Sequence, residues 1–159
     1  MHWKVKREFL KRVEIFSQLG NRELKAIAKS CSENEFANGE YLCHQGERGI
    51  AAFLIISGEV EVLSEMDDGY IIKLATLGQG TFVGELSIID GADRVASIKA
   101  SGDVKTLTLT QWEMLGLIKS KPSIAANMLP IIVKRFRDTS RELRHHSEDN
   151  DEGRKSIYR

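Results

Sequence analysis

The first thirty residues carry apolar side chains at the spacing of an amphipathic helix, in two runs separated by Gly20 and Asn21. Positions three or four residues apart share one face of a helix, so the pattern predicts two short helices, with Asn21 as the N-cap of the second. We assign residues 1–34 to this helical segment. The apolar positions are Phe9, Leu10, Val13, Phe16, Leu19, Leu24, Ile27 and Ala28.

From residue 35 the pattern changes to short segments that alternate polar with apolar residues. Glycines at positions 46, 58, 69, 80, 91 and 102 punctuate this region at intervals of eleven or twelve residues. The segments 59–62 and 104–109 alternate cleanly, which places one face of each on a core. Regular turns between short strands predict an all-β barrel or sandwich over residues 35–110.

Helix-forming residues return over residues 111–146. A short helix is expected over 111–118, ending near Pro122, and a longer one begins at Ser123. Pro130 lies inside the longer run and is expected to kink it. The segment 147–159 is expected to be disordered, because residues 147–156 include no apolar side chain.

Length and charge narrow the function classes. A chain of 159 residues fits one domain with appendages, and 23 basic against 23 acidic residues give no net field to attract nucleic acid. No apolar run is long enough for a membrane span, and the amino end lacks the apolar core of a secretory signal. Cys31 and Cys43 are expected to be reduced thiols of a cytoplasmic protein. The four histidines show no metal-binding spacing, so no metal site or cofactor is expected.

The segment 80–96 carries the most specific chemistry of the chain. Gly84 can adopt backbone angles closed to other residues, so the amides of Glu85, Leu86 and Ser87 could point at an anion. The Glu85 carboxylate can accept hydrogen bonds from a ribose hydroxyl. Arg94 presents a planar fork of donors that suits a phosphate.

These residues resemble the phosphate-binding cassette of the cyclic nucleotide-binding domain family, usually Phe-Gly-Glu-Leu-Ala, a short loop, then Pro-Arg-Ala-Ala. Other family landmarks follow in order over roughly residues 9–140, including the segments 45–47, 55–62 and 77–82. The resemblance implies a mainly β fold with flanking helices, an eight-stranded jelly-roll-like β-roll with N-terminal helices and a C-terminal helical lid. The ligand-binding residues that it implies are Gly84, Glu85, Leu86, Ser87, Arg94, Val95 and Ala96.

Three positions depart from the family pattern. Asp93 replaces the usual Pro, and its carboxylate either points to solvent or folds onto Arg94 and competes with the phosphate. Ile50 stands where an Asp often supports the binding arginine. Val95 stands where cyclic GMP-selective members often carry Thr, which favours cyclic AMP over cyclic GMP.

The resemblance implies a sensor that binds cyclic AMP without changing it chemically, so the chain is not expected to be an enzyme. In the family mechanism the cassette moves inward, Ile88 acts as the hinge residue and the C-terminal helix closes over the base. Phe136, Leu143 and Tyr158 are the candidates for contact with the base. The expected output is a protein partner, a homodimer formed through the apolar face of 124–143, or a further domain outside this sequence, with no nucleic acid. The alternative is a ligand-free interaction scaffold of the same fold, with Asp93 satisfying Arg94.

Overall fold

The computed structural model describes residues 1–157, with side chains through Ser147. Two short helices, α1 (Trp3–Leu10) and α2 (Asn21–Ser30), are separated by the 3₁₀ turn η1 (Glu14–Phe16). The N-cap of α2 is Gly20 rather than Asn21, because the Glu23 carboxylate accepts the Gly20 N–H at 2.7 Å. Lys6 Nζ donates to the Cys31 carbonyl at the end of α2, at 2.7 Å, and so holds α1 against α2.

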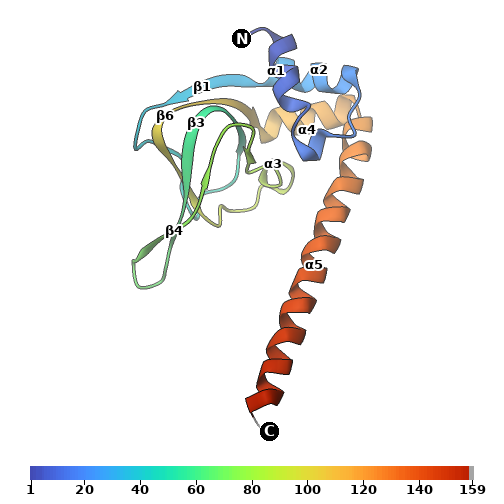
Figure 1. Ribbon diagram of the computed structural model, residues 1–159. Helices are drawn as coiled ribbons and strands as arrows, with labels where there is room; N and C mark the ends of the chain where they lie inside the picture. The colour runs from blue at the N-terminus through green and yellow to red at the C-terminus, as the bar shows by residue number, and fades with distance from the viewer. Residues whose placement is uncertain (158–159) are drawn as a thin grey trace.

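One antiparallel sheet forms the β-roll, in the order β1-β6-β3-β4, with β2 on β6 and β5 on β3. Figure 1 shows the sheet curled on itself, with the β3–β4 hairpin projecting from it. This confirms the expected β-roll with flanking helices. The strands are β1 (Ser32–Phe36), β2 (Tyr41–Cys43), β3 (Ala51–Glu65), β4 (Ile71–Leu77), β5 (Phe82–Val83) and β6 (Ser97–Thr110).

The described residues contain six strands where the resemblance implied eight. The difference lies in β3 and β6, which stay paired along their lengths through Gly58 and Gly102. Both glycines have positive φ, +86° and +81°, and the β3–β6 register shifts beside Gly58. A Cβ on Gly58 would collide with the Asp103 carbonyl oxygen, so the strands approach closely where they bend. Each bent strand is continuous and counts once.

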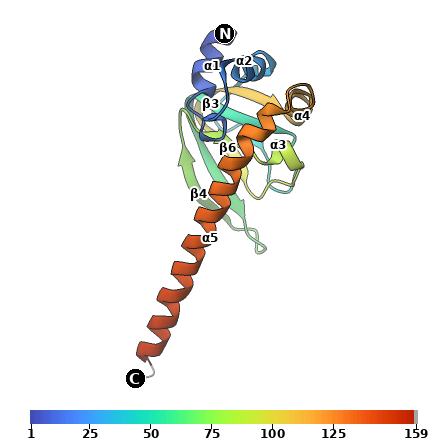
Figure 2. The same ribbon diagram turned by 90° about the vertical axis from the view of Figure 1, so that its right-hand side faces the viewer.

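The helices after the roll are α4 (Gln111–Ser120) and α5 (Ser123–Ile157). Thr110 ends β6 and caps α4, since its hydroxyl accepts the Glu113 N–H at 3.2 Å. α5 continues through Pro130 and extends away from the body as one helix (Figures 1 and 2). Residues 147–157, expected to be disordered, belong to this helix, because a helix satisfies its backbone groups internally without an apolar face. Residues 158 and 159, with the lid candidate Tyr158, lie outside the described residues.

Two apolar clusters make up the core. One fills the interior of the β-roll, around Phe53, Ile55 and Val60. The other joins α1, α2, α4 and the start of α5 to one side of the roll, and its fully buried members include Phe16, Ile88 and Ile124. Ile88 comes from the short helix α3 (Ser87–Asp90), so the predicted cassette is packed directly against the helical layer.

Candidate functional site

The predicted cassette begins where β5 ends. Gly84 has φ +78°, which lets the chain leave the sheet sharply and enter α3. The guanidinium of Arg94 lies directly against Gly84, and a Cβ there would overlap the Nη1 atom. Gly84 is therefore required twice, for its backbone angle and for the space that Arg94 occupies.

α3 is a single turn held at both ends. Ile88 is fully buried, and Gly91 ends the turn in the left-handed conformation, with its N–H donating to the Ser87 carbonyl at 2.7 Å. Gly49 from the preceding loop packs against the turn so closely that a Cβ would lie 2.4 Å from the Ser87 Cβ and 2.7 Å from the Ala92 oxygen. The loop and the cassette therefore form one packed unit.

The backbone around Arg94 is fixed by the same loop. The Arg94 N–H donates to the Glu47 carbonyl at 2.7 Å, and the Gly46 N–H donates to the Arg94 carbonyl at 2.8 Å. Arg48 and Asp93 pair as an isolated antiparallel bridge. These pairings set the direction in which the Arg94 side chain leaves the main chain.

The Arg94 side chain points back across Gly84 and is held by a backbone oxygen. Its Nη2 donates to the Ala51 carbonyl, and its Nε is buried with no hydrogen-bond partner among the described residues. Asp93 is exposed and forms no ion pair with Arg94, so of the two arrangements open at Asp93 the structure has the solvent-facing one. Ile50 is 60% exposed, and the Ala51 carbonyl provides the support that an Asp often provides in the family.

Backbone donors accompany the arginine. Within residues 1–157, the N–H groups of Glu85 and Leu86 donate no hydrogen bond. Successive free amides after a left-handed glycine form a concavity that suits an anion. The guanidinium and these amides belong to the same cavity wall.

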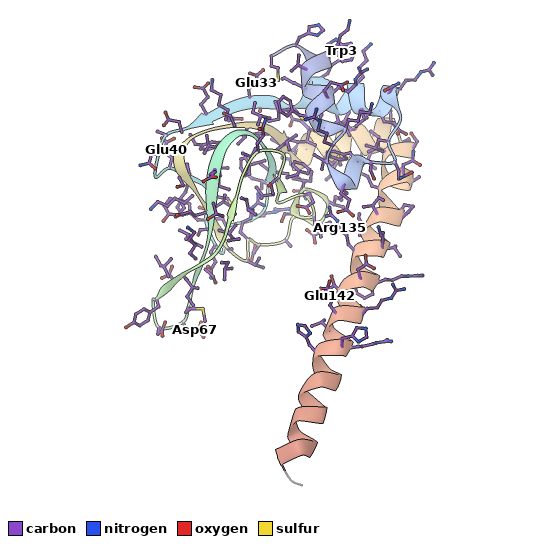
Figure 3. The ribbon with its side chains drawn as sticks, in the orientation of Figure 1. Trp3, Glu33, Glu40, Asp67, Arg135 and Glu142 are labelled. Atoms are coloured by element: carbon purple, nitrogen blue, oxygen red, sulfur yellow. The ribbon has the colours of Figure 1, made fainter. Side chains whose placement is uncertain are left out.

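Glu85 has a partner that the sequence pattern did not reveal. Its Oε1 accepts a hydrogen bond from Arg135 Nη1 on α5 at 2.7 Å, and Arg135 Nη2 lies 3.3 Å from Glu14 Oε2 of η1. Figure 3 shows Arg135 at the level where α5 passes the β-roll. Arg135 therefore connects the cassette, the C-terminal helix and the N-terminal helices. No local motif distinguishes it from the other basic residues of α5.

A cavity of about 530 Å³ lies between the cassette and the inside of the β-roll. Its size is within the range of small-molecule sites. The roll provides an apolar wall that includes Phe53, Val62 and Leu77, and the cassette provides the polar wall. All seven residues expected to bind ligand line this cavity: Gly84, Glu85, Leu86, Ser87, Arg94, Val95 and Ala96.

Apolar side chains lie at the mouth of the cavity, and a cysteine lies in its interior. Val95 is 88% exposed and Leu86 is 47% exposed, so both lie at the mouth. Cys43 lines the interior, where burial raises the pKa of its thiol and the Arg94 charge opposes that rise. The thiol is therefore a neutral part of the wall at physiological pH.

Within residues 1–147, whose side chains the structure describes, no group of three or more His, Cys, Asp or Glu side chains is arranged to hold a metal ion. Within residues 1–157 no helix combines the length and the apolar character that a bilayer span requires.

Comparison with known proteins gives one consistent family. A family model described as "Cyclic nucleotide-binding domain" matches residues 33–121. The cyclic AMP receptor protein of Thermus thermophilus is 30% identical over 129 residues, which cover 81% of this chain and 60% of that protein. The cAMP-dependent protein kinase regulatory subunit of Yarrowia lipolytica is 35% identical over 101 residues, which cover 64% of this chain and 26% of that protein.

Solved structures agree. The N-terminal domain of a transcriptional regulator from Streptomyces coelicolor superposes with a TM-score of 0.76 at 29% identity, covering 82% of this chain and 94% of that one. The chain spans about 60% of the length of the receptor and regulator proteins that it matches. Fold, cassette and sequence all lead to one assignment: the chain belongs to the cyclic nucleotide-binding domain family.

Proposed function

We propose that this chain is a regulatory module that binds cyclic AMP in the 530 Å³ cavity and leaves it chemically unchanged. The observation that carries the proposal is Arg94: among the residues that the structure describes, its buried Nε at the cavity wall has no partner and its guanidinium contacts no carboxylate. A desolvated cation without a counterion is costly, and the cyclic phosphate would supply the missing charge. The free amides of Glu85 and Leu86 would take the remaining phosphate oxygens.

Glu85 would bind the ribose. The carboxylate lies on the same wall as Arg94, and the two flank the turn at Gly84. A ribose hydroxyl donating to Glu85 would orient the nucleotide, with its phosphate toward Arg94 and its base toward the mouth. At the mouth Val95 is aliphatic and exposed, and it offers no hydrogen bond to a guanine, which favours cyclic AMP.

Signalling follows from the contact between Glu85 and Arg135. A ribose hydroxyl at Glu85 would compete with the guanidinium of Arg135, so ligand binding would weaken the attachment of α5 to the cassette. Ile88 would transmit the accompanying shift of α3 to the helical layer in which it is buried. The ligand changes the position of α5 only to the extent that it binds the two arrangements with different affinity.

The partner of this module is expected to be a second copy or another protein. Four apolar side chains on the projecting helix are exposed: Leu129 at 56%, Val133 at 45%, Phe136 at 73% and Leu143 at 64%. Their spacing of four, three and seven residues is that of a coiled-coil seam, so we propose a homodimer through α5. Phe136, one of the candidates for contact with the nucleobase, is part of this seam. We place the module in the cytoplasm, where two thiols stay reduced.

Calorimetric titration tests the ligand assignment. The protein is titrated with cyclic AMP and with cyclic GMP in low-phosphate buffer, beside Arg94→Ala and the matched control Arg48→Ala. Arg48 is an exposed arginine in the adjoining loop. We expect saturable binding of cyclic AMP, retained in the control and weakened at least roughly tenfold in Arg94→Ala. Absence of binding to either nucleotide would support the ligand-free scaffold instead.

A further inference from the structure

The zero net charge of the chain conceals an uneven distribution. Residues 1–30 carry eight basic side chains, Lys4, Lys6, Arg7, Lys11, Arg12, Arg22, Lys25 and Lys29, against three acidic ones, Glu8, Glu14 and Glu23. All three carboxylates are already engaged. Glu23 is buried and bonded to Gly20, Glu14 is paired with Arg135, and Glu8 is paired with Arg7 at 3.0 Å. The surface of α1 and α2 is therefore strongly positive.

Three of these cations are gathered around one aromatic ring. Lys25 Nζ lies 4.8 Å from the centroid of the Trp3 ring, Arg7 Cζ lies 5.8 Å from it, and Lys4 Nζ lies 5.9 Å from it. Each contact with the ring is favourable by about 0.5–1 kcal/mol at an exposed site, yet the like charges repel one another, and only Arg7 has a carboxylate partner, Glu8, at 3.0 Å among the described residues. Lys4 and Lys25 form no salt bridge with any residue in the described part of the chain. An anionic partner would relieve this repulsion.

A groove of about 340 Å³ runs along the same surface. It is lined by Lys4, Val5, Arg7, Glu8, Phe9 and Arg12, with Val5 and Phe9 providing the apolar part. Phe9 is packed against the core, so the groove has a fixed base. Figure 3 shows Trp3 at the end of the body opposite the hairpin tip marked by Asp67. The groove shares no lining residue with the 530 Å³ cavity, so the two sites are separate.

We propose that this groove docks an acidic segment of a partner protein, with an apolar side chain against Val5 and Phe9 and carboxylates facing Lys4 and Arg12. A lipid surface fits less well, because an interfacial helix needs a continuous apolar face. On α1 Leu10 is buried in the core, Phe9 is packed against the core, and Trp3 is half-buried beneath its cations. Charge complementarity at the rim of an apolar groove favours a peptide.

The test uses Trp3 as the reporter. The chain has two tryptophans, and Trp112 is 85% exposed, so Trp112→Phe leaves Trp3 as the single indole at little structural cost. The Trp112→Phe variant of the 159-residue chain is titrated with a synthetic peptide in which pairs of glutamates flank single leucines. A second peptide has glutamine at every glutamate position. Vesicles of phosphatidylserine and phosphatidylcholine form a third arm.

The expected result is a saturable change in Trp3 fluorescence with the glutamate peptide alone, weakened by added salt. Reversing two rim charges, Lys4→Glu with Arg12→Glu, is expected to weaken binding by roughly tenfold. Lys134→Glu with Arg137→Glu makes the same charge change on exposed positions of α5 and is expected to leave binding intact. Equal binding of the glutamine peptide, response to vesicles in preference to peptide, or no response at all would overturn the proposal. Circular dichroism of both double variants checks that each is folded.

Discussion

The carboxylate of Glu85 and the guanidinium of Arg135 meet at 2.7 Å, across 50 residues of chain. Glu85 belongs to the cassette, and Arg135 belongs to the helix that leaves the body. Both side chains are partly exposed, at 22% and 32%. The pair is therefore weak enough to be exchanged for a ligand contact.

Removing Arg135 tests this exchange. Arg135→Ala frees Glu85 for the ribose, so we expect the affinity for cyclic AMP to rise by up to about fivefold, the value of one exposed ion pair. Arg137→Ala removes an exposed arginine two positions away and is expected to change nothing. Calorimetry measures both variants. A lower affinity in Arg135→Ala would mean that Arg135 assists binding and does not compete with it.

Gly84 offers a sharply controlled substitution. Gly84 and Gly80 both have positive φ, +78° and +87°, so an alanine at either is expected to cost about 1 kcal/mol of folding free energy. Only at Gly84 does the new Cβ meet the Arg94 guanidinium, whereas no atom lies within 4 Å at Gly80. We expect both variants to melt at lower temperature and only Gly84→Ala to lose cyclic AMP binding. Retained affinity in Gly84→Ala would contradict the assigned role of Arg94.

The lowered pKa of Glu23 predicts that the free energy of unfolding depends on pH. Hydrogen bonding from Ser123 is the main influence that holds the pKa of this carboxyl below its usual 4.5, with further bonds from the Gly20 N–H and Asn127 and an opposing effect of burial. A pKa that is lower in the folded state stabilises the fold above 4.5, and this stabilisation is lost as pH falls through the folded pKa.

Glu23→Gln should therefore be less stable than the parent at neutral pH and show a shallower loss of stability below pH 4.5. Glu142→Gln, at an exposed position, should follow the parent. Urea unfolding at a series of pH values measures the effect. Parallel curves for Glu23→Gln and the parent would show that Glu23 does not contribute to the acid sensitivity.

The proposed homodimer predicts an effect of charge in the α5 seam. Phe136→Glu puts a carboxylate where two apolar faces would meet, so the dissociation constant should rise by about a hundredfold. Lys134→Glu lies on a different face of the same helix and should leave association unchanged. Sedimentation velocity over a range of concentrations distinguishes the two. A parent protein that is monomeric throughout would exclude this dimer.

The cassette could be predicted from the sequence because its parts are close together along the chain. Gly84, Glu85 and Arg94 lie within one short segment of the chain, and their residue types carry the chemistry directly. The structure brings them to one cavity. The support of Arg94 could not be predicted, because it comes from the main-chain oxygen of Ala51, which no side-chain pattern reports.

Contacts between residues far apart in the sequence, and the exact extent of strands and helices, were harder to predict. Arg135 is one of several basic residues on α5, and only tertiary packing selects it as the partner of Glu85. Strand number depended on whether Gly58 and Gly102 would break a strand or bend it. Residues 148–156 include no apolar side chain, which argued for disorder, yet a helix already formed by residues 123–146 can be extended at low cost once nucleated.

Because α5 is long, a small change at the Glu85–Arg135 contact would move the far end of the helix by a large distance. The helix is anchored to the body near its start, by the buried Ile124 and Met128, with Arg135 as a later contact. Beyond Arg135 it runs for roughly 33 Å, at 1.5 Å per residue, to Ile157. Loosening one ion pair so that the helix tilts by about 10° would swing its far end by about 6 Å. α5 would thus act as a lever arm. A change of hydrogen-bond partner at Glu85 would become a displacement at the far end of α5 that is large enough to alter contacts with a partner there.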